Sequence, residues 1–90
     1  MLEVTKRFET KIFHVGNGFW CEITLDNDSK FGPIYECYIW HDAYMTKQWM
    51  FGLPEYQECN DKHYGWDEII EIVEANMEKY IGYYEEDFMD

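Results

Sequence analysis

The alternation of apolar and polar residues predicts two antiparallel strands at the start of the chain. Between residues 2 and 15, even positions are mainly apolar and odd positions mainly polar, as in a strand with one wet face. Residues 16–18, Gly-Asn-Gly, tolerate the positive φ angles of a tight hairpin. A return strand with the same alternation follows over residues 19–25. The pattern places the even positions of the first strand, such as Ile12, against the core.

Two further strands are expected between residues 34 and 51. Residues 34–40 are apolar on both faces apart from Glu36, which favours a central strand or one covered on both sides. A fourth strand is expected within residues 44–51, before residues 52–54 (Gly-Leu-Pro) stop it. A short helix over residues 43–48 is the alternative, because no clean alternation decides that stretch. Residues 55–65 indicate a polar connection.

The apolar spacing changes to a helical period from Trp66 onward. The apolar stripe predicts a helix over about residues 66–84 and consists of Trp66, Ile69, Ile70, Val73, Met77, Tyr80, Ile81 and Tyr84. Ordering a helix costs about 1–2 kcal/mol per residue in backbone entropy, so the stripe has to pack against another surface. We therefore predict one α+β domain over residues 1–90, a four-stranded antiparallel β-meander followed by a C-terminal helix packed on one sheet face.

Composition and charge exclude several classes of protein. Phe, Trp and Tyr supply 18 of the 90 residues, which excludes intrinsic disorder. The net charge is −12, of which residues 55–90 carry −10 (twelve acids and two bases). Such a field repels nucleic acid and anionic membranes and attracts basic partners. We expect no direct binding to nucleic acid or membrane.

The start of the chain and the cysteines favour a cytoplasmic location. The first residues are charged almost at once and lack the apolar segment of a secretion signal. No apolar run approaches the ~20 residues of a membrane helix. Three widely spaced cysteines, an odd number, do not form a disulfide framework.

Two Cys-x3-His pairs are the nearest approach to a metal or catalytic motif. Cys37 precedes His41, and Cys59 precedes His63. Positions four apart on a strand lie about 13 Å apart, too far to share one ion. Cys59 stands between acidic neighbours that oppose thiolate formation. We expect no catalytic residues, no metal and no cofactor, and hence a protein that is not an enzyme.

Carboxylates on the polar side of the helix are the first candidate for a binding site. The residues predicted to contact a basic protein partner are Asp67, Glu68, Glu71, Glu74, Glu78, Glu85 and Glu86. Side chains three or four apart on a helix are neighbours, so Glu71, Glu74 and Glu78 form a column of like charge. This column resembles the charge spacing of a nucleic-acid backbone. The alternative is a solvated side that keeps a small protein soluble.

The aromatic surplus supplies a second candidate. One helix covers one sheet face, and the other face is left to form an apolar interface if Trp20, Tyr35, Ile39 and Met50 lie on it. Small size, acidity and aromatic richness are together typical of nucleic-acid-mimicking inhibitors and of immunity or antitoxin proteins. The leading hypothesis is an inhibitor-like module that binds a basic partner through its helix. The alternative is a self-associating immunity-type or housekeeping domain, a homodimer formed through the sheet.

Overall fold

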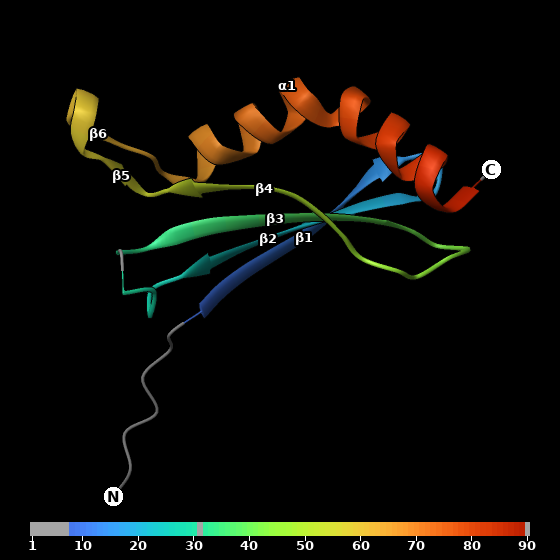
Figure 1. Cartoon of the computed structure of the whole chain (residues 1–90), viewed down its shortest axis with the longest axis horizontal. Helices are drawn as coiled ribbons and strands as arrows, with labels where there is room; N and C mark the ends of the chain where they lie inside the picture. Colours follow the sequence, from blue (N-terminus) through green and yellow to red (C-terminus); the bar gives the residue numbers. More distant parts are fainter. Residues whose placement is uncertain (1–7, 31, 90) are drawn as a thin grey trace, which may run out of the picture.

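The computed structural model describes residues 8–30 and 32–89, and it confirms the predicted α+β class. A four-stranded antiparallel sheet with strand order β1-β2-β3-β4 is followed by one long helix that packs on it (Figure 1). The main elements are β1 (Phe8–Gly16), β2 (Phe19–Asp26), β3 (Ile34–His41), β4 (Gln48–Pro54) and α1 (Trp66–Tyr84). In the described part of the chain, no second helix covers the opposite face of the sheet.

The hairpin between β1 and β2 forms where the sequence predicts it. Gly16, Asn17 and Gly18 have φ angles of 101°, 54° and 83°, all in the region that glycine and asparagine tolerate best. The register shifts between His14 and Gly16, so a β-bulge precedes the turn. The predicted turn chemistry is therefore confirmed.

The predicted orientation of β1 is wrong. Phe13 pairs with the fully buried Cys21 and packs against the core, whereas Ile12 is 54% exposed. Odd positions of β1 thus face the helix, and even positions face away. The polar Lys11 is accommodated on the helix side because its ammonium lies 4.9 Å from the ring centroid of Trp66. Residues 2–7, on which much of the predicted pattern rested, lie outside the described residues.

The fourth element is a strand, β4, and not the short helix that was the alternative for residues 43–48. β3 is central, because it pairs with both β2 and β4. β4 continues to Pro54, so residues 52–54 do not end it; as an edge strand it tolerates a proline without losing a hydrogen bond to a further strand. A register shift opposite Cys37 and Tyr38 lets β4 bury Met50 at 5% exposure.

The core lies between α1 and the sheet. Four residues of the predicted stripe are buried, and the others are half-buried and pack against the core, which confirms the stripe. Two tyrosine hydroxyls connect the sheet with the helix region. The Tyr35 hydroxyl of β3 donates to the Tyr64 carbonyl, just before α1, at 2.9 Å. The Tyr84 hydroxyl of α1 donates to the Thr46 carbonyl, in the turn before β4, at 2.7 Å.

Short elements flank the helix. The connection before α1 folds into a small hairpin of β5 (Tyr56–Gln57), a 3-10 turn (Glu58–Asn60) and β6 (Lys62–His63). A π-helical turn (Glu85–Met89) follows α1.

Candidate functional site

The side of α1 that faces away from the sheet carries the predicted carboxylates. Its exposed members within α1 are Asp67, Glu71, Glu74 and Glu78; together with the exposed Glu85 and Glu86 of the π-helical turn that follows, we call them the acidic helix surface. The one lysine within α1, Lys79, places its ammonium 5.1 Å from the Tyr80 ring centroid. No ion pair neutralises Glu71, Glu74 or Glu78 among the residues that the structure describes. Each like-charged neighbour costs a few tenths of a kcal/mol, so the column slightly opposes helix formation.

Glu68 differs from the other predicted members, because it is half-buried and stabilises the start of the helix. Its Oε1 accepts the Gly65 backbone N–H at 3.3 Å, as the third helical residue does in a capping box. Its Oε2 lies 3.4 Å from the Lys62 ammonium. Glu68 therefore has a structural role that the charge pattern alone does not indicate.

The structure does not bring the predicted apolar interface residues together. Tyr35, Ile39 and Met50 lie in the core at 1%, 0% and 5% exposure, and only Trp20 lies on the opposite face. The grouping fails because both sides of β3 are apolar, so alternation alone does not show which side meets the helix. The bulge in β4 then turns Met50 inward.

A different set of side chains occupies the sheet face opposite the helix. Beside Thr10 and Thr24, this face carries the residues that we call the open sheet surface: Ile12, His14, Trp20, Glu22, Glu36, Tyr38, Trp40, Trp49 and Lys47. Ile12 and Trp49 are 54% and 50% exposed. From this set the sequence predicts Trp20 alone as an interface residue, although the polar positions of residues 19–25 already indicate which side of that strand faces outward.

Aromatic rings form most of this surface. Trp20 and Trp40 face each other across β2 and β3, with ring centroids 6.4 Å apart and planes within 10° of parallel. His14 packs against Trp20 at 4.9 Å. Tyr38 and Trp49 meet edge to face at 5.5 Å, a favoured arrangement for aromatic pairs.

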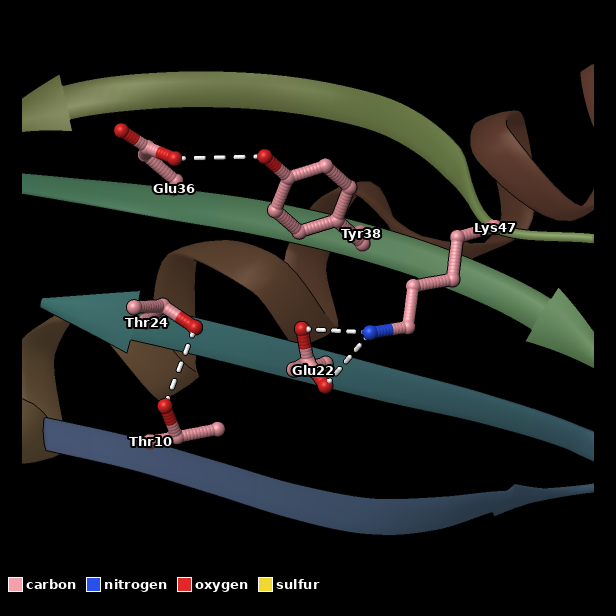
Figure 2. Close-up of polar contacts among 6 residues, drawn as sticks. All are labelled: Thr10, Glu22, Thr24, Glu36, Tyr38 and Lys47. Atoms are coloured by element: carbon pink, nitrogen blue, oxygen red, sulfur yellow. Dashed lines mark hydrogen bonds and ion pairs between the residues drawn. The ribbon is translucent and has the colours of Figure 1, made fainter. Parts of the chain in front are cut away.

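Polar contacts also lie on this face of the sheet; Figure 2 shows those of Lys47 with Glu22, of Tyr38 with Glu36 and of Thr10 with Thr24. The Lys47 ammonium lies 3.0 Å from both carboxylate oxygens of Glu22 and 5.6 Å from the Trp40 ring centroid. The Tyr38 hydroxyl donates to Glu36 at 3.2 Å. Burial, followed by this hydrogen bond to a carboxylate, raises the pKa of Tyr38 above its ordinary value, so the phenol stays protonated and continues to donate.

The cysteines and histidines of the two sequence pairs lie in different parts of the fold. Burial raises the pKa of Cys37 to about 12, and the same holds for Cys21, whereas Cys59 is exposed in the 3-10 turn. His41 bonds to the backbone of the β1–β2 hairpin, and the His63 ring packs against the Tyr56 ring at a centroid distance of 4.5 Å, with the two planes tilted by 37°. Within residues 8–30 and 32–89, no cluster of three or more His, Cys, Asp or Glu side chains is arranged to hold a metal ion.

No helix in the part of the chain that the structure describes is long and apolar enough to cross a membrane. Comparison of the chain with protein-family models, with curated proteins and with solved structures finds no match in any of the three.

Proposed function

We propose that this protein is a non-enzymatic binding module whose acidic helix surface docks on a basic surface of another protein. The observation that carries the proposal is the exposed, unpaired column of Glu71, Glu74 and Glu78 on α1. Two further exposed acids, Glu85 and Glu86, follow the end of the helix. A basic protein surface would remove the repulsion within this column and add attraction of its own.

The most concrete form of the proposal is an inhibitor that covers a nucleic-acid-binding site. Glutamates one helical turn apart are separated by about 5–6 Å, comparable with the phosphate spacing along a nucleic-acid strand. The net charge of −12 would steer a basic partner toward the protein over several ångströms of solvent. DNA should then compete for the same surface of the partner.

Charge reversal at the column tests the proposal. A partner captured by cross-linking from the native lysate is titrated against the original protein and against the variant E71K/E74K/E78K. We expect the variant to fold as well as the original and to bind at least about tenfold more weakly, which corresponds to ~1.4 kcal/mol. Binding of the original protein should weaken at high salt and in the presence of DNA.

Single reversals supply the matched control. Glu74→Lys changes the centre of the column, and Glu58→Lys makes the same charge change at an exposed position outside α1, in the 3-10 turn. We expect Glu74→Lys to weaken binding more than Glu58→Lys does. Equal effects would show that only net charge matters, and full binding by the triple variant would reduce the acidic helix surface to a solvated side of the fold.

A further inference from the structure

We infer that the open sheet surface is a second binding site, for an extended polypeptide segment that carries lysine or arginine at alternate positions. This site lies on the face of the sheet opposite α1, so it is separate from the acidic helix surface (Figures 1 and 2). It combines carboxylates with aromatic rings, the two kinds of group that hold protein cations most strongly.

Lys47 shows what this surface binds. It comes from the exposed turn between β3 and β4, and its ammonium is held between both oxygens of Glu22 and the ring of Trp40. The Glu22 side chain is only 14% exposed, so the carboxylate meets its cation with much of its hydration removed. The chain therefore supplies its own cation to a site made of one acid and one tryptophan.

A second position of the same kind lies beside the first. The Glu36 carboxylate accepts the Tyr38 hydroxyl and, across the described residues, has no cationic partner. Opposite Glu36, β4 has Gly52, over which the Trp49 ring lies so closely that a β-carbon there would come within 3.1 Å of it. Glu36 thus lies beside the aromatic rings of Tyr38 and Trp49, in the same way that Glu22 lies beside the ring of Trp40.

The spacing of the two acids indicates an extended ligand. Glu22 pairs with Tyr38, and Glu36 pairs with Thr24, so the two glutamates are diagonal neighbours across β2 and β3. Diagonal neighbours on a sheet are about 7–8 Å apart. Alternate side chains of an extended segment repeat every ~6.5–7 Å on one side. A Lys-x-Lys or Arg-x-Arg segment can therefore reach both acids.

Charge favours such a segment over a second copy of this chain. Two copies packed through this surface would bring Glu22 and Glu36 of each toward those of the other, in molecules that each carry −12. Like charges placed together across an interface cost several kcal/mol. A basic segment avoids that penalty, because it supplies a cation to Glu36 and a second cation that replaces Lys47 at Glu22.

The probe is the peptide acetyl-Lys-Ser-Lys-Ser-Lys-Ser-Lys-amide, with an otherwise identical peptide of acetylated lysines as its control. Trp20, Trp40 and Trp49, three of the four tryptophans, lie on this surface, so intrinsic fluorescence reports binding there. We expect the charged peptide to bind and the acetylated one to fail. Lys47→Ser should bind the charged peptide several-fold more tightly, because the internal cation no longer competes for Glu22. The variant E22Q/E36Q should lose at least about tenfold in affinity.

Three results would overturn the inference. Lys47→Ser that binds no more tightly would show that Lys47 does not occupy the ligand's place. Retention of binding by E22Q/E36Q, with loss in E71K/E74K/E78K, would move the site to the acidic helix surface. A homodimer that E22Q/E36Q strengthens and the peptide does not dissociate would assign the surface to a second copy. Circular dichroism of each variant confirms that the compared proteins are folded.

Discussion

The hairpin between β1 and β2 offers a sharp test of how the sheet is closed at one end. At Gly18 the backbone has a φ angle of 83°, and an added β-carbon would lie 2.7 Å from Nε2 of His41. The His41 ring has little freedom to move: its Nδ1 accepts the Ala43 N–H at 3.1 Å, and its Nε2 is 3.0 Å from the Asn17 carbonyl. An unprotonated Nδ1 leaves the proton on Nε2, which donates to that carbonyl. Gly18→Ala should therefore break one or both hydrogen bonds.

The expected loss has two parts. A left-handed backbone costs a non-glycine residue about 1–2 kcal/mol. Each hydrogen bond lost at His41 adds about 0.5–1.5 kcal/mol. Gly18→Ala should then lower the free energy of unfolding by ~1.5–5 kcal/mol, depending on whether one or both hydrogen bonds break. Gly16→Ala is the matched control, because Gly16 also has a positive φ of 101° but nothing lies within 4 Å of its added β-carbon. Gly16→Ala should lower the free energy of unfolding only by the backbone contribution of about 1–2 kcal/mol.

Urea unfolding followed by circular dichroism measures both losses by linear extrapolation. The same pair of variants is repeated in a His41→Ala background, where the loss at Gly18 should fall to about that at Gly16. Equal losses for Gly18→Ala and Gly16→Ala in the original background would refute the role assigned to His41. A loss at Gly18 that persists without His41 would refute it as well.

Two other predictions concern the core. Ile69→Ala should lower the free energy of unfolding by about 2–5 kcal/mol, because Ile69 is fully buried between α1 and the sheet. Ile12→Ala, at an exposed position, should lower it by under ~1 kcal/mol. Equal losses for the two variants in urea unfolding would contradict the docking of α1. A thiol reagent should modify Cys59 alone in the folded protein and all three cysteines in urea, because Cys21 and Cys37 are buried. Burial raises the pKa of Cys21 and Cys37 from 9.0 to about 12. Above pH 9 the folded state therefore keeps protons that the unfolded state loses. Stability should therefore be complete below pH 9 and fall as the pH rises from 9 to 12, and a constant urea midpoint over that range would contradict this prediction.

The helix and the first hairpin were predictable because each depends on local pattern. A stripe at helical spacing needs only one apolar surface to pack on, and Gly-Asn-Gly specifies its own backbone angles. The orientation of β1 was not predictable in the same way. A period-2 pattern is identical for the two faces of a strand, and shifting it by one residue exchanges them. Lys11 and Glu9 face the helix because both contact Trp66. The Lys11 ammonium lies over the Trp66 ring, and Nε1 of Trp66 donates a hydrogen bond to the Glu9 carboxylate at 3.0 Å.

The two candidate surfaces differ in the same respect. The acidic helix surface follows from the sequence, because the apolar stripe fixes which side of α1 faces solvent. The open sheet surface depends on strand register, which places Trp20 opposite Trp40 and Tyr38 opposite Trp49. It also depends on a turn that returns Lys47 to Glu22, 25 residues earlier in the chain. Nothing in the local pattern around Lys47 indicates that contact.

In both proposals the surface selects positive charge, but by different physics. The carboxylates of α1 are exposed to water, where salt screens each of them within about 8 Å, so on the proposed function they would act mainly on encounter and orientation. Glu22 and Glu36 are half-buried among aromatic rings, so in the inferred site they would act mainly on how long a bound cation stays. On these proposals the long-range field of −12 would attract a basic partner to the whole molecule, and only short-range contacts would decide which side it occupies. A folded basic surface would then dock on the helix, whereas an extended basic segment would lie along the aromatic side of the sheet.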